Sequence, residues 1–202
     1  MQEILLETVI CLFTAALLMI LHEFVKASVY MALQRAAGSK RKFHNSIWKL
    51  HRYVDPVGLI LSVTSCAPVS RPFMFRIREK KWNRILGIVG FLTIILTFSL
   101  SVLALRMHVF GVNGMQTLEG QGFLVKVITL FLQYTALLSL GMFVVNLFPV
   151  STFDMGLLIA GFSARHYLGI IKKDAIIKMV LIFTLMIDWI HSGVIRIISL
   201  LL

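Results

Sequence analysis

Residues 20–28 read Ile-Leu-His-Glu-Phe-Val-Lys-Ala-Ser, and they place His22, Glu23 and Lys26 inside a stretch that is otherwise strongly apolar. Ionisable side chains within a membrane span are costly, and they therefore usually mark a function. Residues three or four apart lie on one face of a helix, so these three side chains can reach a common partner. What they meet in the folded chain decides both the fold and the function.

The rest of the chain is also apolar: 58% of its 202 residues are hydrophobic, 14% are charged, and the mean hydropathy is +0.89. Uncharged runs at 85–105 and 127–153 are each long enough to cross a bilayer. Residues 1–34 form a third span, and residues 175–202 form a weaker fourth, because charged residues interrupt it. The pattern predicts an all-α multipass membrane protein with four full spans in a single integral membrane domain, residues 1–202.

Two segments between the spans depart from regular helices. Residues 54–70 contain two prolines and are short for a crossing, while basic loops flank them on both sides. We therefore expect a re-entrant hairpin that dips into the membrane and returns. The third span should break near Pro149, because proline lacks the amide donor and clashes with the preceding helical turn. A short helix is predicted to follow this broken helix, from Asp154 to about Tyr167.

The net charge of +11 is concentrated in two loops. Residues 35–52 carry six Lys or Arg and no acid, and residues 71–84 carry six against the single Glu79. Residues 107–122 carry no Lys or Arg. Because short basic loops stay on the cytoplasmic side of a membrane, the two basic loops are predicted to be cytoplasmic. The charge then indicates contact with membrane lipids and not with nucleic acid.

His22 and Asp154 are expected to lie at a similar depth in the membrane. A helix rises about 1.5 Å per residue, so His22 and Glu23 fall in the cytoplasmic third of a hydrocarbon core about 30 Å thick. The break near Pro149 comes late in a span that enters from the outside, and Asp154 follows it at a similar depth. The two polar sites, distant in sequence, are therefore predicted to converge.

The spacing of His22, Glu23 and Lys26 is that of the HExxH pattern with its last histidine replaced. In that pattern two imidazoles four residues apart hold a zinc ion while the glutamate acts as general base. The zinc lowers the pKa of its bound water to about 7, and a carboxylate from elsewhere completes the site. This chain reads His22-Glu23-Phe24-Val25-Lys26, which keeps one imidazole and the glutamate.

Three blocks of sequence resemble the site-2 protease family of intramembrane zinc metallopeptidases, in its compact bacterial form. The blocks are His22-Glu23-Phe24-Val25-Lys26-Ala27, like the family's HExxHA; Asp55-Pro56-Val57-Gly58 followed by Ala67-Pro68-Val69, like its DPxG and proline-rich hairpin; and Asn146-Leu147-Phe148-Pro149-Val150-Ser151-Thr152-Phe153-Asp154, like its N-x-x-P-x-x-x-x-D. The resemblance implies a site-2 protease-like core over about residues 8–168, an extra C-terminal span at 175–202, and a place in a bacterial cell membrane.

The resemblance also implies a role for each matching residue. His22 and Asp154 would be the metal ligands, and Glu23 would be the catalytic general base. Asn146 and Pro149 would shape the break in the helix and help to hold a substrate extended in a groove. The chain departs from the family pattern most clearly at Lys26, and also at Met155, Ser151, Val89-Gly90-Phe91 and Tyr53.

Lys26 decides what such a site can do. A protonated ammonium has no lone pair to give to a metal, and it repels a divalent cation. We therefore expect Lys26 to substitute for the metal by neutralising Asp154, Glu23 or both, which avoids unpaired buried charge. The prediction is a pseudoprotease that has no zinc cofactor, does not hydrolyse peptides and binds transmembrane segments of partner proteins.

Two other functions stay open at this point. The first is an active intramembrane zinc metalloprotease that cleaves transmembrane peptides, in which His22, Asp154 and a third donor hold zinc and Glu23 is the base. His44 and His51 are the candidates for the third donor. The second is a small transporter or scaffold that uses the polar face of the last span. That face carries Lys178, Asp188, Ser192 and Arg196.

Overall fold

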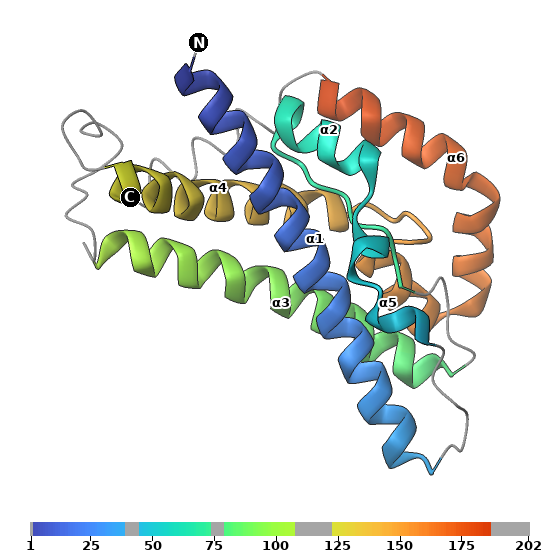
Figure 1. The fold of residues 1–202 in the computed structure, drawn as a ribbon. Coiled ribbons are helices and arrows are strands. Elements are labelled where there is room, and N and C mark those ends of the chain that lie inside the picture. Colours follow the sequence, from blue (N-terminus) through green and yellow to red (C-terminus); the bar gives the residue numbers. More distant parts are fainter. Residues whose placement is uncertain (1, 39–44, 74–78, 108–122, 187–202) are drawn as a thin grey trace.

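The computed structural model of the chain describes residues 2–38, 45–73, 79–107 and 123–186 (Figure 1). All regular secondary structure in these residues is helical. Three helices are long and apolar enough to cross a membrane, and they are α1 (Gln2–Ala36), α3 (Lys80–Arg106) and α4 (Phe123–Asn146). The shorter elements are η1 (Asn45–Trp48), η2 (Leu50–Tyr53), α2 (Pro56–Ser65), α5 (Asp154–Phe162) and α6 (Ala164–Met186). To this extent the prediction of an all-α membrane protein is confirmed.

The long helices keep broad apolar faces uncovered by the rest of the protein. On α3 the exposed side chains recur every three to four residues and so lie on one side of the helix. An apolar face of this size on a protein in water would mark an interaction surface or a liability, whereas a lipid bilayer is its natural surrounding. These side chains include Ile88, Leu92, Ile95, Leu96, Leu100 and Leu103.

α1 crosses α3 and α4 obliquely and packs against both of them (Figure 1). A buried cluster lies where α1 meets α4. It joins small and medium-sized side chains of α1 to Cys66 and Leu138, and those of α1 are Cys11, Ala15 and Leu18. Small residues let helices approach closely inside a membrane, where packing rather than water exclusion drives association. The C-terminal half of α1, beyond this crossing, meets α5, which follows α4.

The predicted hairpin is built from α2 and an extended stretch that returns beside it. Asp55 starts the helix, because its carboxylate accepts a hydrogen bond of 3.0 Å from the backbone N–H two residues later. Cys66 ends the helix in the left-handed conformation, with φ of 51°. The Arg71 N–H then donates to the carbonyl of Tyr53 at 2.9 Å, so the chain returns to the level at which the hairpin began.

The hairpin is held closely by its neighbours. Its two arms touch at Gly58, where a Cβ atom would overlap a carbonyl of the returning arm. Its tip meets α4 at Gly141, where a Cβ atom would overlap the carbonyl of Cys66. The hydroxyl of Ser65 donates to the carbonyl of Leu185 at 3.2 Å, which connects the hairpin to α6.

The predicted break in the third span is confirmed. α4 ends at Asn146, three residues before Pro149, and α5 begins at Asp154. The connecting residues form a tight turn, in which the N–H of Phe153 donates to the carbonyl of Val150 at 3.1 Å. A carboxylate in the first turn of a helix is favoured by the helix dipole, so the start of α5 suits Asp154.

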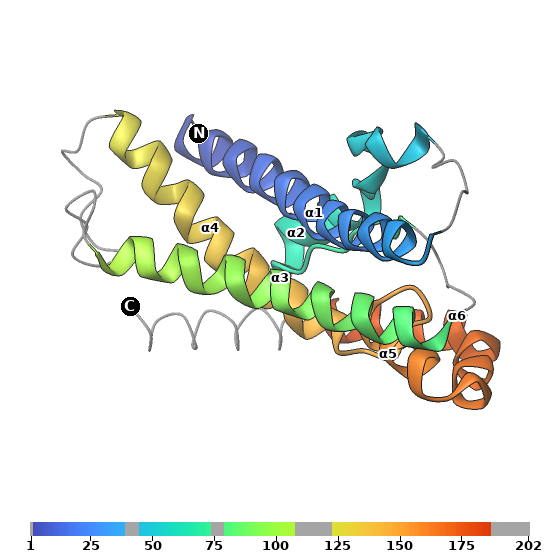
Figure 2. The same ribbon diagram turned by 90° about the horizontal axis from the view of Figure 1, so that it is seen from below.

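The helix after the break ends sooner than the sequence predicted. α5 stops at Phe162 and not near Tyr167, and α6 begins two residues later. Ser163 causes the interruption, because its hydroxyl accepts from the N–H of His166 at 3.4 Å and its carbonyl accepts from the N–H of Tyr167 at 3.1 Å. Seen from below, α5 and α6 lie near the N-terminal end of α3 (Figure 2).

The predicted fourth span lies only partly within the described residues. α6 runs from Ala164 to Met186 and so begins before the predicted position 175, while residues 187–202 lie outside the described part of the chain. Within the part that is described, α6 is not among the helices long and apolar enough to cross a membrane. Four full spans therefore stay a prediction, of which three have structural support.

Candidate functional site

The C-terminal half of α1 presents His22, Glu23 and Lys26 to the interior of the protein. Each of these residues is exposed by no more than 2%, and Asp154 at the start of α5 is completely buried. Ionisable side chains are almost never buried to this extent unless they are paired. Their environment therefore has to supply opposite charges and hydrogen bonds.

The ammonium of Lys26 lies between two carboxylates. Its Nζ is 2.6 Å from Oε1 of Glu23, one helical turn earlier on α1, and 2.9 Å from Oδ1 of Asp154 on α5. The convergence of these two distant stretches of sequence, predicted from depth along the spans, is confirmed. The sequence left open whether Lys26 would pair with Glu23, with Asp154 or with both, and it pairs with both.

The imidazole of His22 forms a second link between α1 and α5. Its Nε2 lies 2.8 Å from Oδ2 of Asp154, and its Nδ1 lies 3.3 Å from the hydroxyl of Ser70 and 3.3 Å from Oε1 of Glu23. Asp154 thus uses one carboxylate oxygen for Lys26 and the other for His22. The buried carboxylate is held from two sides by nitrogen atoms.

The hairpin completes the surroundings of Glu23. The hydroxyl of Ser70 donates to Oε1 of Glu23 at 2.9 Å, and the N–H of Phe73 donates to its Oε2 at 3.0 Å. Both donors come from the returning arm that follows α2. The hairpin therefore fixes the orientation of the carboxylate that would be the general base in the family pattern.

Asp154 is positioned by the broken helix and by α3. Its own N–H faces Oδ1 of Asn146 at 3.4 Å, and the amide nitrogen of Asn146 donates to the carbonyl of Met142 at 2.9 Å. On the other side Gly90 of α3 touches the Asp154 carboxylate, and a Cβ atom at that position would overlap it. Asn146 bridges the two halves of the broken helix, and Gly90 leaves the space for the charge.

The four ionisable groups form a compact network of opposite charges. Two carboxylates, from Glu23 and Asp154, face one ammonium, from Lys26, and one imidazole, from His22. With both ring nitrogens protonated, the imidazole would donate on each side and the network would be neutral overall. Removing one member of such a network leaves an uncompensated buried charge, which is strongly destabilising.

This arrangement does not fit a zinc centre. Lys26 occupies the position of the second imidazole and offers no lone pair, and its Nζ bonds both carboxylates that could otherwise face a metal. Nε2 of His22 and Oδ2 of Asp154 bond each other directly at 2.8 Å. Among the described residues there is no group of three or more His, Cys, Asp or Glu placed to hold a metal ion.

The other residues that the sequence singled out are placed as follows. Asn146 is buried in the helix break, whereas Pro149 is exposed, and their predicted part in holding a substrate stays a prediction. His51 is exposed on η2, and His44 lies outside the described residues. On the predicted polar face of the last span, Lys178 pairs with Asp174 at 2.7 Å. The other members of that face, Asp188, Ser192 and Arg196, lie outside the described residues.

Sequence reasoning missed three contributors to the site. Ser70 and Phe73 lie in the hairpin but outside the quoted family blocks, and Phe73 acts through its backbone, which no side-chain pattern reveals. Gly90 was noted only as part of a departure from the family pattern. A glycine in the middle of an apolar span is a usable signal, because small residues there often permit a close approach.

A cavity of about 320 Å³ adjoins the site through Ser70. Its lining comes from the hairpin, from the turn before α5 and from α6, and it includes the apolar side chains of Leu61, Phe153 and Leu181. Lys178 also lines it and is paired with Asp174. The cavity therefore offers an apolar space beside the buried charges.

Two ionisable groups outside the predicted spans, Tyr53 and Asp174, have shifted pKa values. Burial, together with the negative charge of Glu23, raises the pKa of the Tyr53 phenol, whose hydroxyl donates to the carbonyl of Ile47 at 2.5 Å. Partial burial would raise the pKa of Asp174, but hydrogen bonds from Lys178 and from the N–H of Ser151 outweigh it and lower the pKa. Both groups therefore keep their usual charge near neutral pH.

Comparisons of the chain with family models, with curated proteins and with solved structures find no match. The likeness to site-2 proteases thus rests on the three sequence blocks. The contacts among His22, Glu23, Lys26 and Asp154 are a property of this chain and stand independently of any family.

Proposed function

We propose that the chain is a site-2 protease-like membrane protein in which the ammonium of Lys26 replaces the metal, and which binds transmembrane segments of partner proteins without cleaving them. The membrane is proposed to be a bacterial cell membrane, with the basic loops 35–52 and 71–84 on the cytoplasmic side. The charge asymmetry between these loops and residues 107–122 supports that orientation.

One observation carries the proposal. The Nζ of Lys26 lies within 2.9 Å of both Glu23 and Asp154, at the place where the family pattern calls for a metal between an imidazole and a carboxylate. A cation bound to the protein by a covalent side chain balances the same charges permanently. It activates no water, because an ammonium is not a Lewis acid and has no open coordination position at which water could bind.

Binding of a partner's membrane segment is supported by the cavity beside Ser70. The cavity is bounded by the hairpin and α6, and most of its side chains, such as Leu61, Leu181 and Ile182, are apolar. A membrane segment presents side chains of the same kind and gains from close packing rather than from leaving water. The volume of about 320 Å³ suits a few side chains of a partner and not a whole helix.

Metal content is the direct test. Wild-type protein purified in zinc-containing buffer and then washed should contain far less than one zinc per chain by elemental mass spectrometry. Lys26→His, which restores the second imidazole, should take up more zinc than the wild type, and Lys126→His is the control at a partly exposed lysine away from the site. One zinc per chain retained by the washed wild type would refute the proposal.

Cleavage of a transmembrane reporter separates the proposal from an active protease. The proposal expects no cleavage by wild type and no change in Glu23→Gln. The active alternative expects cleavage that Glu23→Gln abolishes, because the general base would be lost. Detecting such a difference would favour the enzyme.

Photo-crosslinking tests the binding role. A photoreactive amino acid at Leu61, which lines the cavity, should crosslink a partner's membrane segment in cells. The same probe at Ile88, on the exposed apolar face of α3, is the control and should crosslink mainly lipid. Equal protein crosslinking at the two positions would argue against binding in the cavity.

A further inference from the structure

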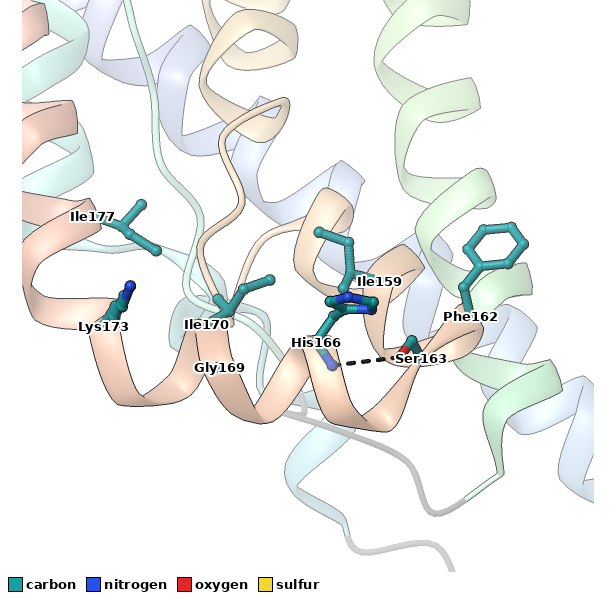
Figure 3. A pocket seen from close by; sticks show the side chains of 8 residues that line it. All are labelled: Ile159, Phe162, Ser163, His166, Gly169, Ile170, Lys173 and Ile177. Carbon is teal, nitrogen blue, oxygen red and sulfur yellow. Dashed lines mark hydrogen bonds between the residues drawn. The ribbon is translucent and has the colours of Figure 1, made fainter.

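A second cavity, of about 550 Å³, lies between the end of α5 and the first turns of α6, away from the buried charges (Figure 3). Ile159 and Phe162 line it from α5. From α6 the lining residues include His166, Ile170 and Lys173, which are three to four residues apart and so share one face of the helix. We call this cavity the α5–α6 groove.

The α5–α6 groove has an almost entirely apolar surface, with a few polar side chains among its lining residues. Ile159, Ile170 and Ile177 supply apolar side chains along its length. The charged side chain among the lining residues is Lys173, which Figure 3 shows near Ile177, at the end of the groove away from Ser163; its ammonium is a hydrogen-bond donor. A ligand for such a groove needs an apolar chain and an acceptor group with negative charge.

Positive charge gathers around the groove from two helices. The end of α5 packs on the first turns of α3, since a Cβ atom at Gly161 would meet the backbone of Arg84 at 2.8 Å. The guanidinium of Arg84 lies 5.4 Å from the ring centre of Phe162, which lines the groove. The cations in the first turns of the two helices are Lys80, Lys81, Arg84, Arg165, Lys172 and Lys173.

Acidic groups near the groove leave this charge largely uncompensated. The only acid of α6 within its described residues, Asp174, is already bonded to Lys178 at 2.7 Å and to the N–H of Ser151 at 2.8 Å. The first turns of α3 add only Glu79, at the start of the helix. The surface around the groove is thus complementary to an anion.

We propose that the α5–α6 groove binds one anionic phospholipid. Its phosphate accepts hydrogen bonds from the ammonium of Lys173, and one acyl chain lies along the isoleucines of the floor. The groove stands beside the first turns of α3, which is long and apolar enough to cross a membrane, so it is placed where a headgroup meets the hydrocarbon. A soluble phosphate lacks the chain that the floor accommodates.

The first experiment compares two neighbouring lysines. Wild type, Lys173→Ala and Lys172→Ala are reconstituted in phosphatidylcholine nanodiscs with increasing phosphatidylglycerol, and lipid retained after transfer to detergent is counted by native mass spectrometry. Both variants lose one positive charge, but only Lys173 lines the groove. Lys173→Ala should weaken phosphatidylglycerol binding roughly fivefold to tenfold, and Lys172→Ala by less than about twofold.

The second experiment fills the groove without changing charge. Gly169 lines it, and a Cβ atom there has no heavy atom within 4 Å, so Gly169→Phe adds a side chain whose Cβ atom meets no neighbour and whose ring occupies part of the groove. This variant should lose bound phosphatidylglycerol as Lys173→Ala does, while its folding is checked by an unchanged thermal unfolding temperature.

Three results would overturn the inference. Equal losses in Lys172→Ala and Lys173→Ala would indicate attraction by general surface charge. Equal retention of phosphatidylcholine and phosphatidylglycerol would remove the anionic headgroup from the argument. Displacement of the lipid by millimolar glycerol phosphate, or full binding by Gly169→Phe, would show that the acyl chain plays no part.

Discussion

Two lysine–glutamate pairs that involve α1 have the same Nζ–Oε1 distance but opposite surroundings. Lys26 lies 2.6 Å from Glu23 in the interior, and Lys126 lies 2.6 Å from Glu3 near the start of the helix. The first pair is exposed by no more than 2%, whereas Glu3 is exposed by 77% and Lys126 by 23%. The distance between the charged atoms therefore does not distinguish a buried ion pair that stabilises the fold from an ion pair at the surface.

The difference lies in what would remain if one partner were lost. A carboxylate at the position of Glu3 is solvated without its lysine, and exposed pairs contribute little. The buried carboxylates of Glu23 and Asp154 cannot be solvated by water in this way. Their charges are balanced by Lys26 and His22. Four substitutions, with expected effects that decrease in the order given, test this difference in dependence.

Lys26→Met should cause the largest loss of stability, about 3–5 kcal/mol, because it leaves two buried carboxylates with one imidazole. Unfolding in mild detergent monitored by circular dichroism measures the change. Adding Asp154→Asn to Lys26→Met should recover part of the loss, since the unpaired negative charge is then removed. A loss below about 1 kcal/mol for Lys26→Met would equate the buried pair with a surface pair.

Gly90→Ala should destabilise by about 1–3 kcal/mol, because its Cβ atom overlaps the Asp154 carboxylate and forces the network to shift. The matched control is Gly169→Ala in α6, where a Cβ atom has no heavy atom within 4 Å. In a helix the control substitution should be neutral or slightly stabilising. Equal effects in the two variants would mean that the Asp154 carboxylate is not confined.

The half-exposed pair of Asp174 and Lys178 provides an intermediate case. The pKa of the Asp174 carboxyl in the folded protein is lowered from its ordinary value of 3.8. The stability that this carboxylate contributes is therefore fully present above pH 3.8 and is lost as the pH falls through the lowered pKa. Asp174→Asn should therefore reduce stability at pH 7 by at most about 1 kcal/mol and narrow the difference from wild type in acid. Unfolding measured from pH 3 to 7 tests this, and a difference that grows on acidification contradicts it.

Lys126→Met should have the smallest effect, with no measurable change in unfolding at physiological salt. Raising the ionic strength should not alter the difference between this variant and wild type, because salt already screens exposed charges. A loss of stability close to that of Lys26→Met would show that the buried and the surface ion pair do not differ. Unfolding of both variants in parallel, at two salt concentrations, decides the matter.

The sequence predicted the outline of the fold because its signals are long and local. Uncharged runs of membrane length gave α3 and α4, and Pro149 marked the broken helix. The end of α5 was predicted too late, because no proline or glycine marks a helix end just after Phe162 and Ser163 alone acts as the capping residue. A single capping hydroxyl interrupts a helix without altering its composition.

Part of the candidate site was predictable and part was not. The contact of Lys26 with Glu23 and Asp154 followed from depth along the spans, which brings Asp154 to this level, and from the need to neutralise buried acids. The bonds from Ser70 and the Phe73 amide depend on how the hairpin's returning arm lies against α1. That placement is set by tertiary packing, which spacing along the chain does not encode.

The glycine contacts of the hairpin determine which wall of the site can open. The hairpin is wedged against α4 at Gly141 and closed on itself at Gly58, so outward sliding would require α4 to move with it. α6 covers the other side of the cavity through apolar contacts and the bond from Ser65 to Leu185. We expect backbone amides of α6 to exchange with solvent sooner than those of α2, and a partner to enter from that side.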